Sequence, residues 1–241
     1  MVRTNSAMRR FCAARARSMP ERVCCWRGCR LLRHRSNGIA AMDLDPGSTI
    51  VEVRSGAGWL TEILAGLHYQ VECIEPAETM IAAAKERVAG FLAAHAMGGL
   101  LPRVRWHCTT LEESELPNGS ADAMLFFESF HHIIDEHTAL KNAHRIMKPG
   151  AVLCILGDAN WNPGHQGQES FWQEEMDRFG TLESPFTHGY LEHALMKNGF
   201  VRFQRYHSVN GLVPIERGTD PVRGFAQLDA ETVNLITARR L

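Results

Sequence analysis

The chain has 241 residues, of which 45% are hydrophobic and 22% are charged, the size and composition of one globular domain with an ample core. No run of the sequence approaches the ~18 apolar residues that a membrane-spanning helix needs. The formal net charge of −1 hides an asymmetry, because residues 1–35 contain ten arginines and one acid, Glu21, whereas the remainder carries 16 basic and 26 acidic side chains. An acidic body argues against a nucleic-acid-binding surface, so we expect neither nucleic acid nor a membrane as a partner.

Residues 1–38 are rich in arginine, poor in acids and without sustained apolar periodicity. Three interpretations are open for them: a transit-like presequence, a disordered basic tail, or a start codon upstream of the true one. We therefore expect a basic leader at 1–38 outside the fold, followed by one domain at 39–241. The leader has no apolar segment of the kind that directs secretion, and isolated cysteines in apolar strands are typical of a reducing compartment, so we expect the cytoplasm.

The stretch Thr49–Gly66, TIVEVRSGAGWLTEILAG, indicates a buried strand, a glycine turn and the first turns of a helix. Gly56 and Gly58 allow the backbone to turn sharply and to approach a ligand closely. Such a unit opens a doubly wound nucleotide-binding fold. A dinucleotide fingerprint would need a small residue where Thr61 stands, which disfavours a nicotinamide-dependent oxidoreductase.

A second strand follows at residues 70–75 and ends on the acidic Glu75, before Pro76 and a helix from Ala77 to about Ala94. In nucleotide-binding α/β folds, an acid at this place can accept both ribose hydroxyls, and Glu75 lies 17 residues beyond Gly58, close to the usual spacing of ~20. The alternative is that the carboxylate favours the positive N-terminus of the following helix.

The rest of the chain continues the alternation of strands and helices. The pattern predicts the following elements: strands at Val104–Cys108, Ala123–Phe127 and Ala151–Leu156, a helix at Leu140–Met147 stopped by Lys148-Pro149-Gly150, an irregular segment at Asp158–Pro185, a helix at Tyr190–Asn198, and strands at Phe200–Tyr206 and Thr232–Ala238.

In combination, the glycine turn, Glu75 and the later run AHRIMKPGAVLCIL resemble the class I S-adenosylmethionine-dependent methyltransferases of the small-molecule, methyltransferase domain 11-like type. The family's first motif is an acid followed by three alternate glycines; Glu52, Gly56 and Gly58 are in register with it, and Arg54 stands where the first glycine is usual. The resemblance covers residues 47–157 well. It implies an α/β, Rossmann-like, doubly wound, seven-stranded and mostly parallel sheet with an antiparallel edge strand and helices on both faces.

The resemblance also implies S-adenosylmethionine as the cofactor and assigns residues to its parts. Glu52 is expected to hold the amino end of the cofactor, the glycine turn to admit its methionine portion, Glu75 to bind the ribose, and Thr110-Leu111 to border the adenine. The expected cofactor-binding residues are Glu52, Arg54, Ser55, Gly56, Gly58, Glu75, Pro76, Thr110, Leu111 and Phe127. Because glycine is favoured at the place of Arg54, its φ is expected to be one that other residues reach at a cost of about 1–3 kcal/mol.

Three candidate catalytic residues, Glu128, His131 and His132, directly follow the fourth strand. The carboxyl ends of the central strands border the ligand in an open parallel sheet, so any of the three is placed to remove a proton from the acceptor. A structural role for the histidine pair is the alternative. No metal is expected, because His131, Asp135 and His137 do not all face one way on a helix, and Cys25, Cys29 and His34 match no usual ligand spacing.

The expected function is therefore S-adenosylmethionine-dependent methyl transfer to a small-molecule acceptor, with oxygen as the first candidate atom and a sugar or glycan precursor as the first candidate molecule. The leaving group is already a sulfonium, so alignment supplies most of the rate, and a base is needed only if the acceptor must lose a proton. The alternative is a degenerate protein of the same fold that binds or scaffolds without turnover, which Arg54 and the uncharged Thr110 favour. The sequence carries no signal for an oligomeric state.

Overall fold

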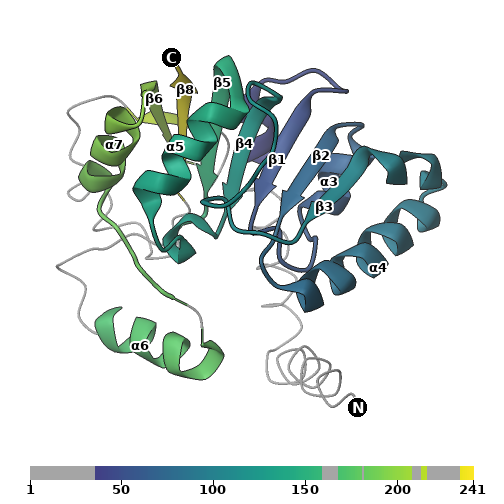
Figure 1. The fold of residues 1–241 in the computed structure, drawn as a ribbon, viewed down its shortest axis with the longest axis horizontal. Helices are drawn as coiled ribbons and strands as arrows, with labels where there is room; N and C mark the ends of the chain where they lie inside the picture. Colours follow the sequence, from purple (N-terminus) through teal and green to yellow (C-terminus); the bar gives the residue numbers. More distant parts are fainter. Residues whose placement is uncertain (1–35, 159–167, 181, 208–212, 216–233) are drawn as a thin grey trace.

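The computed structural model describes residues 36–158, 168–180, 182–207, 213–215 and 234–241 (Figure 1). Its strands are β1 (Thr49–Val53), β2 (Gln70–Ile74), β3 (Val104–His107), β4 (Ala121–Phe127), β5 (Met147–Leu156), β6 (Phe200–His207), β7 (Val213–Ile215) and β8 (Asn234–Arg240). The helices are α3 (Thr61–Gly66), α4 (Glu78–Ala94), α5 (Glu136–Ile146), α6 (Gln168–Phe179) and α7 (His188–Lys197), with 3-10 helices η1 (Gly98–Arg103) and η2 (Phe130–His132).

All eight strands form one sheet in the order β3-β2-β1-β4-β5-β8-β6-β7. The first five run parallel, with β1 between β2 and β4. In both β1 and β2, four of the five residues are buried, as expected for parallel strands that are covered on both faces. This half of the sheet is the doubly wound arrangement that the sequence predicted.

The other half of the sheet is antiparallel. β8 lies between β5 and β6 and pairs antiparallel with both, and the short β7 adds to the outer side of β6. The predicted antiparallel pairing of the last two long strands is confirmed. The eighth strand, β7, was not predicted, because three residues carry too little periodicity to be distinguished from a loop.

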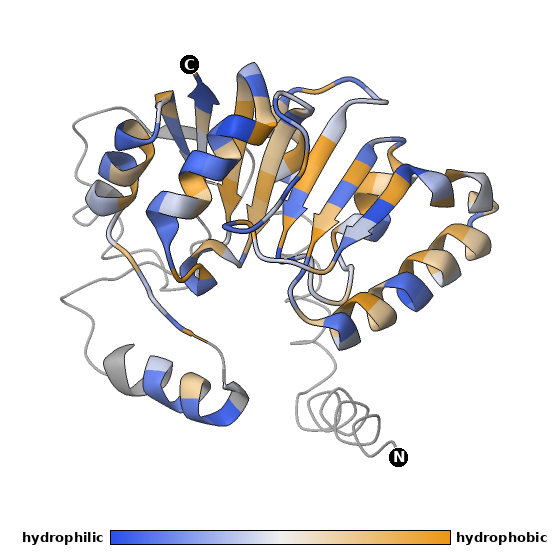
Figure 2. Cartoon of the chain, in the orientation of Figure 1, coloured by the Kyte–Doolittle hydropathy of each residue, from blue (hydrophilic) through white to orange (hydrophobic). Residues whose placement is uncertain are grey.

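Helices cover both faces of the sheet, and each face has its own hydrophobic cluster. On one face α5 and α7 pack through Leu140, Leu191 and other apolar side chains onto β4 and β5. On the other face α3 and a helix at residues 36–42 pack on β1, β4 and β5, and α4 packs on α3 and β3. Figure 2 shows the hydrophobic colours concentrated in the strands between these layers.

Several element boundaries differ from the predicted ones. The segment predicted as irregular contains α6, and α5 begins at Glu136 because Asp135 caps it by accepting a hydrogen bond from the Thr138 amide at 3.0 Å. β5 starts at Met147, and a register shift between Ala121 and Ala123 accommodates the Lys148-Pro149-Gly150 run as a bulge instead of a turn.

The predicted boundary at residue 38 falls inside the first described helix, at 36–42, where Gly38 lies against Leu156. Residues 1–35 lie outside the described residues, so the basic leader stays a prediction. Within the part of the chain that the structure describes, no helix combines the length and the apolar character that crossing a bilayer requires.

Gly58 is the point at which the turn after β1 touches α4. A Cβ built on it would lie 3.0 Å from the Cβ of Ala84, 3.3 Å from its Cα and 3.3 Å from a methyl carbon of Val88, and its φ is +75°. Neither a backbone atom nor an alanine methyl can rotate away. The absent side chain therefore allows close packing of the turn on α4.

We predict that Gly58→Ala lowers the free energy of unfolding by about 2–5 kcal/mol, from overpacking and from the left-handed backbone together. Urea denaturation measures this loss. Gly119→Ala is the matched control, because Gly119 has φ +60° but no atom within 4 Å of a built Cβ, so it keeps only the backbone cost of about 1–2 kcal/mol. Equal losses in the two variants would contradict close packing at Gly58.

Candidate functional site

The predicted site residues gather where the parallel strands end. The turn after β1, Glu75 after β2, the segment 128–132 after β4 and Asp158 after β5 all lie at the carboxyl ends of neighbouring strands. In Figure 1, α6 lies on this side of the sheet. We call this side the carboxyl edge; open α/β sheets bind their ligands there.

Glu75 joins the turn after β1 to the start of α4. Its Oε2 accepts a hydrogen bond from the Gly56 amide and its Oε1 accepts one from the Ala77 amide, both at 3.0 Å, and the side chain is buried. A carboxylate has about four lone-pair sites, so each oxygen keeps one for a ligand hydroxyl. The prediction that Glu75 binds a ribose is compatible with this geometry.

Arg54 adopts the backbone conformation that the sequence led us to expect for glycine, with φ 55°. An arginine in this left-handed region costs roughly 1–2 kcal/mol. Its amide donates to the Ile74 carbonyl at 2.7 Å, which ties the turn to the end of β2. The Arg54 side chain is half-buried, and its positive charge makes the smallest of the contributions that shift the pKa of His132 downward.

Glu52 lies beneath the turn and is satisfied by the protein itself. Its side chain is only 3% exposed, and its Oε2 accepts a hydrogen bond of 2.6 Å from the Thr61 hydroxyl. The sequence interpretation noted Thr61 only as a misfit to the dinucleotide fingerprint. The structure gives it a role, which is to hold the motif's acidic residue in place from the first turn of α3.

Two residues predicted to contact the cofactor also pack within the protein. A Cβ built on Gly58 would meet α4, so this glycine makes room for the helix. Leu111 is 1% exposed, and its side chain belongs to the hydrophobic cluster under α5. Their contacts with the cofactor stay predictions, and the backbone is the part of each residue that is left to make them.

The other predicted cofactor residues keep their places near the carboxyl edge. The Thr110 hydroxyl accepts from the Glu113 amide at 3.3 Å, and the Pro76 carbonyl accepts from the Cys108 thiol at 3.6 Å. Ser55 is buried, with no partner for its hydroxyl among the hydrogen bonds of the described residues, and it lies near the Cys73 thiol. Phe127 packs against the cluster on the α3 face.

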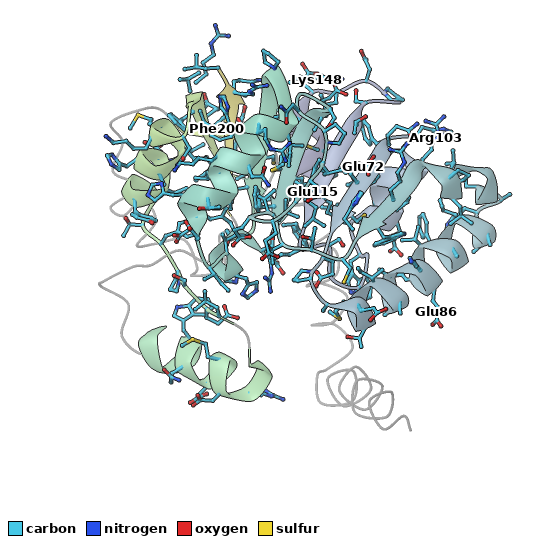
Figure 3. The ribbon with its side chains drawn as sticks, viewed as in Figure 1. Glu72, Glu86, Arg103, Glu115, Lys148 and Phe200 are labelled. Atoms are coloured by element: carbon cyan, nitrogen blue, oxygen red, sulfur yellow. The ribbon has the colours of Figure 1, made fainter. Side chains whose placement is uncertain are left out.

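Another buried carboxylate, Glu72, is not part of the site. It lies within β2, away from the carboxyl edge (Figure 3), where it pairs with the Arg105 guanidinium and with Nε2 of His107 at 2.7 Å. These partners come from the neighbouring strand β3. The ion pairs of Glu72 therefore connect β2 with β3 and are structural.

Asp158 organises the segment after β4, and sequence reasoning missed it. Its Oδ2 accepts from the amides of Phe130 at 2.7 Å and Ser129 at 3.4 Å, while its Oδ1 accepts from the His131 amide at 3.0 Å and from the His131 ring Nδ1. The available signal was an acid directly after the fifth strand, beside the end of the fourth.

His131 lies between two carboxylates. Its Nδ1 contacts Asp158, and its Nε2 is 3.2 Å from Oε2 of Glu183, which follows α6. Burial, the largest single effect, lowers the pKa of His131, but the hydrogen bond and charge of Asp158, with the charges of Glu183 and Glu128, together raise it above its ordinary value. The imidazolium form is thus favoured.

His132 has the opposite electrostatic environment. Its Nδ1 lies 2.5 Å from the Leu182 carbonyl, to which it donates, so Nε2 is the acceptor nitrogen. Burial and the charge of His131 lower the pKa of His132, so it is neutral at pH 7. We call His131, His132, Glu183 and Asp158 the histidine corner.

Glu128, the third predicted catalytic residue, begins the segment with φ 49° and affects the corner through its charge on His131. The metal set that the sequence interpretation rejected is not brought together. Asp135 caps α5, and Nδ1 of His137 pairs with the Asn198 amide at 3.0 Å. Ligand atoms of His131, His132 and Glu183, in contrast, all lie within 4.8 Å of one another.

The fold and its edge define a Rossmann-like α/β domain with polar groups at the carboxyl ends of β1, β2, β4 and β5. Residues 51–155 match a family described as a methyltransferase domain. This match covers less than half of the chain, and it agrees with the resemblance to the class I S-adenosylmethionine-dependent methyltransferases that the sequence shows over residues 47–157.

Curated relatives match part of the chain. The ubiquinone biosynthesis O-methyltransferase of Rhodopseudomonas palustris (strain HaA2) is 30% identical over 134 residues, 55% of this chain and 48% of that protein. The protein of that name from Bradyrhizobium diazoefficiens is 31% identical over 116 residues, 48% of this chain and 42% of that protein. The chain therefore spans about half the length of these relatives.

Solved structures show the same fold at low identity. A chain of the complex between the Haloferax volcanii Trm112 methyltransferase activator and the putative methyltransferase aligns with a TM-score of 0.64 at 14% identity, covering 86% of this chain and 89% of that one. Geranyl diphosphate C-methyltransferase from Streptomyces coelicolor A3(2) aligns with a TM-score of 0.61 at 16% identity, covering 86% and 76%.

We predict that Asp158→Asn lowers the pKa of His131, because it removes the negative charge that favours the imidazolium, whereas the wild-type pKa lies above 6.5. A raised pKa stabilises the folded state below the unfolded value of about 6.5, and this stabilisation is lost as pH rises through the folded pKa. The fall in unfolding free energy above pH 6.5 should therefore be shallower in the variant.

Imidazole NMR titration measures the pKa, and urea denaturation at several pH values measures the stability. The unfolding free energies of wild type and variant should be compared above pH 6.5. Below that pH, the lowered pKa of His132 makes the unfolding free energy fall as the pH falls, which is opposite to the effect of His131. Glu128→Gln is the control, since its charge contributes least of the three carboxylates. A His131 pKa that does not respond to Asp158→Asn would refute the pairing.

Proposed function

We propose that the protein transfers a methyl group from S-adenosylmethionine to a hydroxyl oxygen of a small molecule. The observation that carries this proposal is the meeting of two units at one edge: the turn after β1 with Glu75, and the histidine corner after β4 with a neutral imidazole. The names of the curated relatives, which are O-methyltransferases, support oxygen as the acceptor atom.

The chain's residues fit the cofactor in chemical type. Glu75 holds the turn in place and keeps lone pairs for ribose hydroxyls, and a Cβ built on Gly56 would have only Met80 Cε at 3.9 Å and the Arg54 carbonyl at 4.0 Å near it. The bound cofactor supplies a methyl group on a sulfonium sulfur. Glu52 and Thr61 lie beneath the turn after β1 and support it through their hydrogen bond.

The histidine corner is where we place the acceptor. The acceptor's O–H bond breaks, its oxygen forms the new bond to the methyl carbon, and the proton goes to a base. His132 is the imidazole of the corner that is neutral at pH 7, and Glu128 and His131 adjust its surroundings. Trp172 of α6, whose ring centre is 6.3 Å from that of His131, offers an apolar wall beside it.

For the acceptor molecule, the relatives' names favour a precursor of a quinone over the sugar that the sequence interpretation put first. Both belong in the same screen. A gain of one methyl group, detected by mass spectrometry after incubation with S-adenosylmethionine and candidate hydroxyl compounds, tests the proposal directly.

A degenerate binding protein is the second candidate function, and the left-handed Arg54 is the observation that favours it. A side chain and a positive charge replace the glycine that usually approaches the cofactor there. The two candidates differ in a simple measurement, because an active enzyme must bind the cofactor product S-adenosylhomocysteine.

We predict that the protein binds S-adenosylhomocysteine and that Glu75→Ala weakens this binding roughly 10- to 150-fold, the loss of a charge-assisted hydrogen bond worth about 1.5–3 kcal/mol. Isothermal titration calorimetry measures the dissociation constants. Glu78→Ala is the matched control, an exposed acid three residues further on in the first turn of α4. Equal constants for wild type and Glu75→Ala would remove Glu75 from the site.

We predict that His132→Gln lowers kcat by about 10²- to 10⁴-fold with little change in S-adenosylhomocysteine binding, because the variant lacks the basic nitrogen. In the wild type, kcat/KM should fall only at pH values below 6.5, since the pKa of His132 is lowered from that value. His95→Gln, at an exposed position on α4's C-cap, is the control. A His132→Gln rate within a few-fold of wild type would exclude His132 from proton removal.

A further inference from the structure

We propose that His131, His132 and Glu183 form a binding site for one divalent transition-metal ion, such as Zn²⁺, Co²⁺ or Mn²⁺. Among the residues that the structure describes, they are the one group of at least three histidine, cysteine or acidic side chains whose ligand atoms converge, all within 4.8 Å. The ligands come from two segments: η2 after β4, and residues 182–187 after α6.

The spacing of the ligand atoms fits an ion. Two ligands at ~2.1 Å from a metal lie about 3.0 Å apart at a right angle and about 3.4 Å apart at the tetrahedral angle. Nε2 of His131 is 3.2 Å from Oε2 of Glu183, and Nδ1 of His132 is 3.6 Å from Oε1 of the same carboxylate. To bind the ion through Nδ1, His132 gives up the proton that it donates to the Leu182 carbonyl. Ligand atoms that are up to 4.8 Å apart must also move inward to close around an ion.

The contact between His131 and Asp158 is also typical of a metal-ligating histidine. Ligating histidines commonly donate their second ring N–H to a carboxylate, which fixes the ring and its tautomer. Nδ1 of His131 contacts Asp158, and Asp158 is itself held by the amides of Ser129, Phe130 and His131. The opposite nitrogen, Nε2, is thereby aimed at Glu183, and a bound ion would take the place of its proton.

The kind of ion follows from the ligands. Two imidazoles and one carboxylate suit transition metals, whereas Mg²⁺ and Ca²⁺ prefer sets made of oxygen. Three protein ligands leave coordination positions open, which is the pattern of catalytic and not structural sites. Glu128, Asp158 and Glu183 supply negative charge around the corner, which outweighs the positive charge of Arg54.

For catalysis the site deepens the proposed function and rests on it. The acceptor oxygen binds the ion at an open position, and coordination lowers the pKa of its hydroxyl. The O–H proton then leaves to water, and the oxygen's electron pair forms the bond to the methyl carbon as the bond from that carbon to the sulfonium breaks. His132 serves as a ligand in this state, so the ion takes over the task that the free imidazole would perform.

The test is metal binding by the full-length protein after treatment with a chelator. Titration with Co²⁺, followed by visible absorption, should show one saturable ion per chain without the charge-transfer band of thiolate ligation, which separates this site from binding to cysteines. His132→Gln and Glu183→Gln should each weaken binding at least tenfold, and Asp158→Asn, which keeps all three ligands, should weaken it about 10- to 100-fold. His95→Gln should bind as the wild type does.

Circular dichroism establishes that each variant is folded before titration. Absence of a saturable ion, or equal affinity in the wild type, His132→Gln and Glu183→Gln, overturns the metal site. That outcome leaves the proposed function standing, because S-adenosylhomocysteine binding by the chelator-treated protein tests it separately. If the protein binds Co²⁺ but not S-adenosylhomocysteine, the metal site stands and the proposed methyl transfer is overturned.

Discussion

The site depends on one interaction that occurs twice: a carboxylate after one strand accepts hydrogen bonds from the backbone amides that follow the adjacent strand. Glu75, after β2, accepts a hydrogen bond from the Gly56 amide in the turn after β1. Asp158, after β5, accepts hydrogen bonds from the amides of Ser129, Phe130 and His131 after β4. Turns at the ends of parallel strands leave amides without a sheet partner, and burying them unsatisfied costs free energy. The acids remove that cost and fix both turns at the same edge.

These two clamps divide the edge into two functional parts. The hydrogen bond between Glu75 and the Gly56 amide places a carboxylate beside a glycine backbone. In the proposed function, these groups suit the ribose of the cofactor and its neighbouring methionine portion. The Asp158 clamp orients His131, whose ring pairs with Glu183 and whose backbone carbonyl accepts a hydrogen bond from the Ser184 amide at 3.0 Å. The segment after α6 is thus attached to the sheet through a histidine that is itself held by an acid. A change at Asp158 therefore reaches both the imidazole pair and the segment beyond α6.

The sequence predicted those parts of the site that depend on local pattern. The strand, turn and helix around Gly56, the acid that ends β2 and the histidines after β4 are all encoded within short windows, and the structure brings them to one edge. The partners Thr61, Asp158 and Glu183 were missed, since each acts on a residue that is distant in sequence or on another element. The packing of Gly58 on α4 and of Leu111 under α5 was missed for the same reason, because it depends on neighbours in space and not on the local sequence.

The fold alone does not decide the chemistry, because one fold can carry many different functions. The distinguishing features are the side chains of this chain at the edge, and Arg54 is the most unusual of them. Its left-handed backbone costs roughly 1–2 kcal/mol, yet its charge also helps to lower the pKa of His132. Arg54 thus combines strain in the turn after β1 with a charge that lowers the pKa of His132. Under the proposed function these two effects act on different steps, because the strain affects cofactor binding, whereas the charge affects proton removal from the acceptor. On that proposal, Arg54 favours loss of cofactor affinity over loss of proton removal, and a weakly binding enzyme is more consistent with this edge than an inert one.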